Sequence, residues 1–567
     1  MTRSQDHAGS RTANPTGLDL GGLGYRRDDG VWSRPGRGSF GYSDGDAAEE
    51  WVRDTMLAAD DRSSSSPELE ARIVDWPSLY HLSSLRGNVI RPLLERLTGP
   101  VLELGAGMGA VTRVLGEAGL DVVAVEGSAR RAQICAARCH DLDNVQVVSD
   151  TIAGFGQPAQ FGTVVMVGVL EYSRTFGSTS DDGDAVDLML EHVQGLLAPG
   201  GQLVVAIENQ LGAKYLAGFR EDHLGRSMVG VEDGYGPTTA VTFGRDELRR
   251  RLSAAGLTHQ QWYYPWPDYK LPTTVVSEAG LDPTSGFDPT ALVVGTAYQD
   301  AQEPPVPTID LAQLYPVLVR NGLLGDLANS FLVTASHTAQ APEETLAWYY
   351  GGATRLAEVR KTVVFTPGPD GPQAVTSTAD GTTTTDVFSQ GRLWSQELAA
   401  ITSRPGWTTD QFAEWLEMWR TCVAQLSGAG RLTAGTVLPG EMLDAISRNL
   451  VVDGRRVTFI DLEWTSPEPL DFGFLLFRNL LGAVLGLHWV APPAPGTPLT
   501  FGELLKVGAR SMGIRLDRAT LEAYWKRECD FQRAVTGTDS SPESVGPLLN
   551  ASLRIRPTLE ALVQAAS

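Results

Sequence analysis

The feature that most constrains the fold is a regular alternation of short apolar runs and amphipathic segments between residues 75 and 299. Strands that alternate with helices pair in parallel, because each helix carries the chain back across the sheet. The pattern predicts an α/β fold with a doubly wound, mostly parallel, seven-stranded sheet. Two further apolar runs, His259–Tyr264 and Ala291–Tyr298, are candidates to close its edge. The other five predicted strands are Pro100–Leu104, Asp121–Val125, Val145–Val148, Thr163–Val169 and Gln202–Ile207.

Changes in composition divide the chain into four predicted parts. Residues 1–40 are rich in Gly, Ser, Arg and Asp and lack periodicity, so a disordered tail is expected. Residues 41–74 are expected to form a helical extension, and residues 75–300 the α/β domain. The Pro-rich, acidic stretch Gln302–Pro307 marks a boundary. Beyond it, residues 301–567 predict an α+β domain.

Charge and cysteine content exclude several classes of protein. The chain has 46 basic and 68 acidic residues, a net charge of −22, which argues against binding nucleic acid or anionic membranes. Four cysteines cannot support a disulfide-dense scaffold. The apolar run Phe472–Val490 is interrupted by Arg478, Asn479 and His488, which predicts a buried helix rather than a membrane span. No N-terminal apolar segment indicates export, so a cytoplasmic location is expected.

The strongest chemical signal is the glycine-rich stretch Val101–Gly109, which follows a predicted strand and precedes a predicted helix. Glycines there let the backbone turn tightly and approach a ligand closely. Glu126 ends the next strand, where an acid can accept hydrogen bonds from both hydroxyls of a ribose. The spacing also fits a dinucleotide fingerprint ending at Ala110. A nicotinamide-binding loop and a purely structural turn therefore remain alternatives at this point.

Three further features favour S-adenosylmethionine as the ligand. Glu103 stands two residues before the first glycine, where enzymes that use this donor place an acid facing its amino acid part. Asp150 follows the third strand, from which a carboxylate can reach the adenine amino group. Leu197–Leu203 (LAPGGQL) leads into the fifth strand, as in many methyltransferases.

Residues 75–280 resemble class I S-adenosylmethionine-dependent methyltransferases, and more narrowly those of bacterial O-antigen and related glycan clusters. The likeness covers over a third of the chain, and its later stretches are more specific than the glycine loop. Gln210 departs from the family, which has a basic residue there. The shared stretches are Tyr80–Ser83 with Arg86, Val101–Gly109, Val125–Ala132, Val167–Ser173, Ala206–Asn209, Leu211–Tyr215, Glu221–His223 and Tyr264–Pro272.

The resemblance implies a donor site in which acids hold the two ends of the donor and strand-end residues lie beneath its sulfonium. Transfer to a hydroxyl also needs a base, and His223, beside Glu221 and Asp222, is the leading candidate, with His81 and Glu208 as others. The implied donor-binding residues are Glu103, Gly105, Ala106, Gly107, Gly109, Glu126, Gly127, Asp150, Thr151, Gly168, Val169 and Glu171.

The acceptor site is predicted from residues after the fifth strand and from the aromatic stretch Trp262–Tyr269, whose rings suit the C–H faces of sugars but also simply pack. Glu208 and Asn209 have capping of the following segment as their alternative role. Cys135, Cys139 and His140 have no second pair of ligands nearby, so no metal site is expected. The candidate acceptor-binding residues are Asn209, Lys214, Tyr215, Trp266, Asp268 and Lys270.

A second signal lies in the C-terminal part and resembles the small-molecule phosphotransferase branch of the kinase fold. Asp444 is followed five residues later by Asn449 and, after a strand, by Asp461. The resemblance implies a catalytic Asp444, with Asn449 and Asp461 holding Mg²⁺ for ATP. The likely third strand, Gln373–Ser377, carries no lysine for the phosphates, and Glu397 therefore has no such partner. A binding remnant and an active kinase both remain open, as do plain loop roles for the three residues.

These observations leave four hypotheses for function. The first is a methyltransferase that acts on a hydroxyl of a sugar, glycan or glycosylated acceptor, with glycosyltransferases as expected partners. The others are a bifunctional kinase–methyltransferase of a glycan end, a methyltransferase of a secondary-metabolite pathway, and a non-catalytic scaffold for glycan assembly. The donor motifs do not distinguish transfer to oxygen from transfer to nitrogen or carbon.

Overall fold

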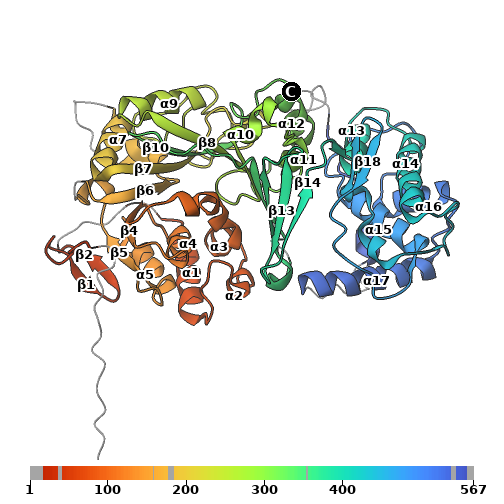
Figure 1. Ribbon diagram of the computed structural model, residues 1–567, viewed down its shortest axis with the longest axis horizontal. Coiled ribbons are helices and arrows are strands. Elements are labelled where there is room, and N and C mark those ends of the chain that lie inside the picture. Colours follow the sequence, from red (N-terminus) through yellow and green to blue (C-terminus); the bar gives the residue numbers. More distant parts are fainter. Residues whose placement is uncertain are drawn as a thin grey trace, which may run out of the picture. The chain divides into compact units, whose positions relative to one another are not determined.

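The computed structural model describes residues 17–35, 41, 43–156, 159–176, 184–352, 355–537 and 545–557. The chain forms two compact units, each assembled from separate stretches of sequence (Figure 1). The first unit comprises Met1–Gly212, Val229–Val275 and Ala328–Glu343. The second comprises Ala213–Met228, Val276–Leu327 and Glu344–Ser567.

The first unit contains a large, mostly parallel sheet with strands in the order β1-β2-β5-β4-β3-β6-β7-β10-β8. Strands β2, β5, β4, β3, β6 and β7 pair in parallel, whereas β10 is antiparallel to both of its neighbours, β7 and β8. The predicted mixed α/β fold with a mostly parallel sheet is confirmed for this unit. The bounds are β1 Arg26–Asp28, β2 Val31–Ser33, β3 Val101–Leu104, β4 Val122–Glu126, β5 Val145–Ser149, β6 Phe161–Val167, β7 Leu197–Glu208, β8 His259–Trp266 and β10 Ser330–Ser336.

The order in which the strands follow one another creates the crevice that holds the site. From β3 the chain steps outward through α4 (Ala110–Glu117) to β4 and through α5 (Ala129–Arg138) to β5. It then returns to β6, on the other side of β3, and steps the opposite way through α7 (Ala185–Leu196) to β7. Because such crossovers are right-handed, helices of the two halves cover opposite faces of the sheet. The connections after β3 and β6 therefore diverge, and ligands bind in the crevice between them.

The strand that completes this sheet lies outside the predicted domain boundary. Strand β10 spans residues 330–336, beyond the boundary expected at residue 300, and it inserts between β7 and β8. The run Ala291–Tyr298, which was expected to close the sheet, instead contains the helix α11 (Thr290–Val294). A short apolar run fits a buried helix and a buried strand equally well, so its hydrogen-bonding partner decides between them.

The N-terminal segment differs from the predicted disordered tail. Residues 17–35 form a hairpin of β1 and β2, and β2 adds to the edge of the sheet in parallel with β5. The rest of the predicted tail lies outside the described residues. The predicted helical extension consists of α1 (Asp46–Ala58) and α2 (Pro67–Glu70). Val52 and Met56 of α1 pack in one apolar cluster with Met108 of the glycine loop.

The remaining elements of the first unit flank the sheet. Residues predicted as one helix, Leu85–Leu97, form two consecutive 3₁₀ helices, η1 (Ser84–Val89) and η2 (Arg91–Arg96). Three short turns of helix follow the strands that line the crevice: η3 (Ile152–Gly154), η4 (Leu170–Tyr172) and α6 (Ser173–Phe176). The longer helices are α3 (Trp76–Leu82) and α9 (Arg245–Ala254).

The second unit contains an antiparallel meander and a helical bundle. The meander pairs β11 (Ala347–Gly351), β12 (Lys361–Thr366), β13 (Gln373–Thr378) and β14 (Thr383–Val387) in order. Small sheets pair β15 (Arg392–Leu393), β17 (Leu450–Asp453) and β18 (Arg456–Phe459), and β16 (Val437–Leu438) with β19 (Leu470–Asp471). The main helices are α12 Leu311–Arg320, α13 Trp394–Thr402, α14 Thr409–Ser427, α15 Phe472–Leu485, α16 Phe501–Ser511, α17 Arg518–Thr536 and α18 Val545–Asn550.

The bundle has its own apolar core, built on tryptophans of α14 and the buried helix α15. Trp415 and Trp419 of α14 are almost fully buried, and Trp419 stacks on Phe472 of α15. The short elements of this unit are α8 Ala213–Leu216, α10 Glu278–Leu281, η5 Pro283–Ser285, η6 Ala357–Val359, η7 Gly440–Asp444 and η8 Ser447–Asn449. Strand β9 (Thr274–Ser277) contains the boundary between the two units, which falls after Val275. Within the described part of the chain, no helix has the length and apolar character needed to cross a membrane.

Candidate functional site

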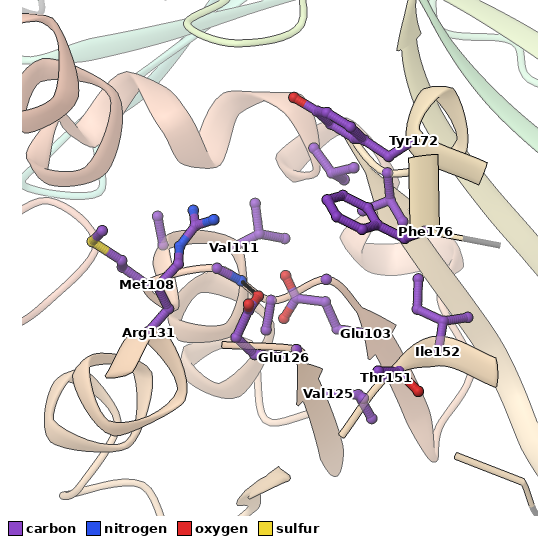
Figure 2. A pocket seen from close by; sticks show the side chains of 18 of the residues that line it. Glu103, Met108, Val111, Val125, Glu126, Arg131, Thr151, Ile152, Tyr172 and Phe176 are labelled. Carbon is purple, nitrogen blue, oxygen red and sulfur yellow. Dashed lines mark hydrogen bonds between the residues drawn. The ribbon is translucent and has the colours of Figure 1, made fainter. Parts of the chain in front are cut away.

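A pocket opens at the carboxyl ends of β3, β4, β5 and β6 in the first unit (Figure 2). Its walls come from the glycine loop after β3, from the ends of β4 and β5, and from the segment after β6. Glu103 and Glu126 point into the cavity, while Tyr172 and Phe176 form an aromatic wall on another side. A pocket with two carboxylates and an apolar wall can hold a ligand that is polar along one edge and flat and apolar along another.

Glycine is required at the first position of the loop for two reasons. Gly105 has φ of +74°, a left-handed conformation that other residues rarely adopt. A Cβ atom on Gly105 would also lie 2.5 Å from Cγ2 of Val169, on the segment after β6. The glycine therefore allows the loops that follow β3 and β6 to meet at the floor of the pocket.

The carboxylate of Glu126 is fixed by the backbone. Its Oε2 accepts a hydrogen bond from the Gly107 N–H at 2.8 Å, and its Oε1 accepts one from the Ser128 N–H at 2.9 Å. The side chain of Glu126 is 4 % exposed, and it reaches the pocket from the end of β4. A carboxylate has about four lone-pair positions, so Glu126 retains capacity to accept hydrogen bonds from ligand hydroxyls.

Glu103, the other acid of the pocket, lies on β3 and is buried at 3 % exposure. Burial raises the pKa of Glu103 to about 7, although the hydrogen bond that it accepts from the Thr112 hydroxyl acts in the opposite direction. A carboxyl group with this pKa is poised between its two charge states at neutral pH. A bound cation would shift it to the ionised form.

Most residues predicted to bind the donor line this pocket. Besides the residues above, the lining includes Ala106, Gly127, Asp150, Thr151 and Gly168. Two of the predicted donor-binding residues, Gly109 and Glu171, are described by the structure but do not belong to the pocket lining. Gly109 is instead the left-handed N-cap of α4, packed against Cys135. Glu171 is buried in η4, where its backbone carbonyl accepts a hydrogen bond from the Val241 N–H.

Several lining residues had no binding role predicted from the sequence. Tyr80 and Arg86 lie within a stretch already noted for its family resemblance, so that resemblance was the available signal. Arg131 follows Glu126 in another such stretch. Tyr172 lies in a third such stretch, Val167–Ser173, whereas Phe176 carried no distinguishing pattern.

Arg86 joins two motifs that are far apart in the sequence. Its Nη1 donates to the backbone carbonyls of Tyr269 at 3.1 Å and Lys270 at 3.2 Å, and its Nη2 donates to the Tyr80 hydroxyl at 2.8 Å. The guanidinium is buried at 5 % exposure. These contacts place the segment after β8 against the residues that line the pocket.

His81 lines the pocket, but its Nε2 is engaged by the Asp44 carboxylate at 2.9 Å. Burial lowers the pKa of His81 to about 4, although the hydrogen bond to Asp44 opposes this shift. The imidazole is therefore neutral at pH 7. Because its basicity is so low, His81 is a weaker candidate for a general base than an ordinary histidine.

Glu208, Asp268 and Lys270 form a buried ion cluster at the end of β7. The Lys270 ammonium lies 2.7 Å from Glu208 and 3.0 Å from Asp268. Asn209, next to Glu208, donates to the Ala328 carbonyl and accepts from the Leu211 N–H, as a residue that caps a turn does. These interactions bring three predicted acceptor or base residues together, whereas Asn209 has the structural role that was its alternative.

The aromatic stretch on β8 does not form an exposed platform for a sugar. Trp262, Tyr263, Tyr264 and Trp266 are each at most 2 % exposed. Trp262 and Tyr264 pack edge-on against Phe331 of β10. Strand β10, which these two rings contact, comes from residues that were predicted to belong to another domain.

Three predicted residues of the methyl-transfer site belong to the second unit. His223 lies in the turn closed by the hydrogen bond from Glu221 N–H to the Arg226 carbonyl, and it is half-buried. Lys214 is buried on α8, with its ammonium 3.3 Å from Asp300, and lies over the ring of its neighbour Tyr215. The base role of His223 and the acceptor roles of Lys214 and Tyr215 remain predictions.

The second unit brings part of the predicted phosphotransfer set together. Asn449 donates through its side-chain amide to the backbone carbonyls of Asp444 at 3.0 Å and Asp461 at 3.4 Å. The Asp444 carboxylate, however, is buried and pairs with Arg478 at 3.0 Å, and Arg478 also pairs with Glu528 at 2.7 Å. Burial raises the pKa of Asp444, although Arg478 opposes this shift.

A lysine does lie in the antiparallel meander, one strand before the predicted third strand. The predicted third strand is β13, which has none, but the preceding strand, β12, begins with Lys361. The Lys361 ammonium contacts the Asp461 carboxylate and lies 3.0 Å from Glu463. Glu397 pairs with Arg392 at 2.9 Å. The lysine was missed because the acid that it meets is distant in sequence.

With this geometry in place, comparison with known families identifies the central part of the first unit. The model of a family described as "Methyltransferase domain" matches residues 102–203, which run from β3 into β7 and contain the glycine loop, Glu126 and Asp150. Residues 102–203 are a class I S-adenosylmethionine-dependent methyltransferase domain. The methyltransferase domain includes four of the strands that surround the pocket. None of the curated proteins compared with the chain matches it.

Solved structures similar to this chain include three methyltransferases. One, from Thermotoga maritima, is a methyltransferase described as a possible histamine N-methyltransferase. Its sequence is 16 % identical to this chain; the alignment covers 46 % of this chain and 92 % of the Thermotoga maritima chain, with a TM-score of 0.26. Phosphoethanolamine N-methyltransferase 2 of Haemonchus contortus is 16 % identical over 45 % of this chain and 53 % of its own, with a TM-score of 0.27. The methyltransferase CcbJ of Streptomyces caelestis is 24 % identical over 23 % of this chain and 52 % of its own, with a TM-score of 0.19. The chain thus spans about half the length of the last two proteins.

Proposed function

We propose that this protein transfers a methyl group from S-adenosylmethionine to a hydroxyl of a sugar, glycan or glycosylated acceptor. The observation that carries the proposal is the pair of acids at adjacent strand ends, Glu103 and Glu126, which point into one pocket beside a loop that requires glycine. The set fits the donor, which carries an ammonium group at one end and ribose hydroxyls near its middle.

The residues of the pocket would divide the donor between them. Glu103 would accept hydrogen bonds from the ammonium in the methionine part of the donor. Glu126 would accept hydrogen bonds from the ribose hydroxyls of the donor. Asp150 and Thr151 would hold the adenine, and Tyr172 and Phe176 would exclude water from the reacting end. When bound, the donor supplies a cationic sulfonium whose methyl is attacked in line, and the protein contributes mainly orientation and exclusion of water.

A hydroxyl acceptor must also lose its proton. Glu208 and His223 are the proposed bases, and His81 is the least favoured because its pKa is about 4. The resemblance to O-antigen methyltransferases favours a glycan acceptor, a cytoplasmic location and glycosyltransferase partners. A glycosylated secondary metabolite is the main alternative acceptor, and a screen of nucleotide sugars, glycans and glycosylated antibiotics for methylated products would distinguish them.

The experiment that tests donor binding is calorimetric titration with S-adenosylhomocysteine, the product form of the donor. We expect micromolar binding by the wild type and at least about tenfold weaker binding by Glu126→Ala, since a buried carboxylate contributes roughly 1.5–3 kcal/mol to each hydrogen bond it accepts. Glu247→Ala is the control, because Glu247 is half-buried on α9, pairs with Arg251 at 3.1 Å and lies outside the described pocket lining. Absence of binding by the folded wild type would revive the scaffold hypothesis.

We propose, as a second candidate function, that the second unit binds a nucleotide with Mg²⁺, as in a bifunctional kinase–methyltransferase of a glycan end. The specific observation that favours this is the contact of Lys361 with Asp461 and Glu463, which gathers a strand ammonium and two carboxylates at one place. Asp461 also has φ of +58°, a left-handed conformation that is uncommon for residues other than glycine and that clusters at functional sites. The engagement of Asp444 by Arg478 weighs against an active kinase.

Titration with ATP in the presence and absence of Mg²⁺ tests this second function. We expect Mg²⁺-dependent binding that is lost in Asp461→Ala and Lys361→Met. Asp453→Ala, at an exposed position at the end of β17, should bind like the wild type. Equal affinity with and without Mg²⁺, or in all variants, would reject it.

A further inference from the structure

The N-terminal hairpin brackets the segment that forms one end of the pocket. Four consecutive residues after β5 line the pocket: Asp150, Thr151, Ile152 and Ala153, the last two of which belong to η3. At one end of this segment, the Tyr25 hydroxyl donates to Oδ2 of Asp150 at 2.5 Å. At the other end, the Arg34 guanidinium donates to the Gly154 carbonyl at 3.2 Å. Both contacts come from hairpin residues that directly flank its two strands.

The two bracketing residues are themselves held in place. The Arg34 guanidinium carbon lies 4.3 Å from the centre of the Tyr25 ring, as in a cation–π contact. The Tyr25 ring also packs near Phe155, and both side chains are buried. Strand β2 is in register with β5, with Ser33 opposite Ser149, the residue before Asp150. The hairpin is thus hydrogen-bonded to the strand that carries the pocket acid and to the turn that follows it.

We propose that Tyr25 is a positioning residue for donor recognition and that the hairpin of residues 17–35 forms part of the adenine end of the site. The Tyr25 hydroxyl fixes the orientation of the Asp150 carboxylate, which then accepts a hydrogen bond from the exocyclic amino group of the adenine. The inference rests on the proposed function, because it takes S-adenosylmethionine as the ligand. If the hairpin packs against the sheet more tightly when the donor is bound, then the packed hairpin must also raise the affinity for the donor. This follows because the coupling free energy between two events is reciprocal.

The test compares S-adenosylhomocysteine with S-inosylhomocysteine, in which a carbonyl oxygen replaces the amino group, by calorimetry. A carbonyl facing a carboxylate loses the hydrogen bond and places two acceptors together, so the wild type should prefer the adenosine form by about tenfold or more. In Tyr25→Phe, the Asp150 carboxylate loses the hydrogen bond from the Tyr25 hydroxyl. We expect this preference to fall at least about threefold, mainly through weaker binding of the adenosine form.

Tyr263→Phe is the matched control. The Tyr263 hydroxyl is also buried and also donates to a carboxylate, Glu343, at 3.0 Å, but Tyr263 does not belong to the described pocket lining. This variant should lose stability but keep the wild-type preference for the adenosine form. A purely structural role of Tyr25 would give the same result in Tyr25→Phe, and an unchanged preference there would overturn the proposal.

Hydrogen exchange of the wild type provides a measurement that does not depend on a folded variant. Addition of S-adenosylhomocysteine should slow exchange in residues 26–33 as well as in the glycine loop. Slower exchange in the glycine loop alone would overturn the hairpin inference while leaving the methyltransferase proposal intact. Absence of binding by the folded wild type would instead refute the proposed function, and this inference with it.

Discussion

The raised pKa of Glu103 predicts that donor affinity depends on pH near neutrality. If the ammonium of S-adenosylhomocysteine binds only the ionised carboxylate, affinity follows the ionised fraction of Glu103. With a pKa of about 7, that fraction rises from about one tenth at pH 6 to about three quarters at pH 7.5. We therefore expect the association constant to rise about eightfold over this interval. His81, whose pKa is about 4, stays neutral throughout and contributes no titration.

Calorimetric titration at pH 6, 6.5, 7 and 7.5 measures this dependence. Glu103→Gln should bind about 10–100-fold more weakly at pH 7.5, the range expected for loss of a hydrogen bond to a charged group, and its affinity should no longer depend on pH. Glu126→Gln is the informative control, because it should lose affinity and yet keep the pH dependence. Equal wild-type affinity at pH 6 and pH 7.5, with the protein folded at both, would refute the reasoning.

The same group affects the stability of the ligand-free protein, with a definite sign. Burial raises the pKa of Glu103, so the folded state holds its proton more tightly than the unfolded state does. The stabilisation is complete below the ordinary pKa of 4.5 and is lost as pH rises through about 7. At 1.36 kcal/mol per pKa unit, the loss is at most about 3 kcal/mol. Denaturant unfolding at pH 5 and pH 8 should show a smaller loss for Glu103→Gln than for the wild type.

Three further perturbations follow from the packing. Gly105→Ala should abolish detectable binding of S-adenosylhomocysteine in calorimetry, since its Cβ would lie 2.5 Å from Val169; Gly119→Ala, with a similar φ but open space around it, should bind normally. Arg478→Ala should lower the free energy of unfolding by about 3–5 kcal/mol in denaturant titration, because it leaves two buried carboxylates without their cation; an effect below 1 kcal/mol would contradict this. A chain ended after residue 300 should show no cooperative thermal unfolding by circular dichroism, because β7 and β8 both lose their shared partner β10; a sharp transition would show that β10 is dispensable.

The central part of the methyltransferase domain was predictable because its signals are local. Each strand from β3 to β7 is an apolar run next to an amphipathic helix in sequence, and the right-handed crossover rule converts that order into a parallel sheet. The glycine loop and the strand-end acids follow from the same order, because the carboxyl ends of parallel strands meet at one edge. Glu103, Glu126 and Asp150 were therefore predictable as residues of one pocket, and the structure places all three in its lining.

The sequence by itself thus determined the alternating core, its glycine loop and the identity of the acids around the pocket. Only the tertiary structure decided which distant segments complete that core. Strand β10, the Tyr25 hairpin and the pairing of Lys361 with Asp461 each join residues about a hundred or more positions apart. Such contacts depend on hydrogen-bonding edges and buried charges that exist only once the chain has folded, so no local pattern encodes them.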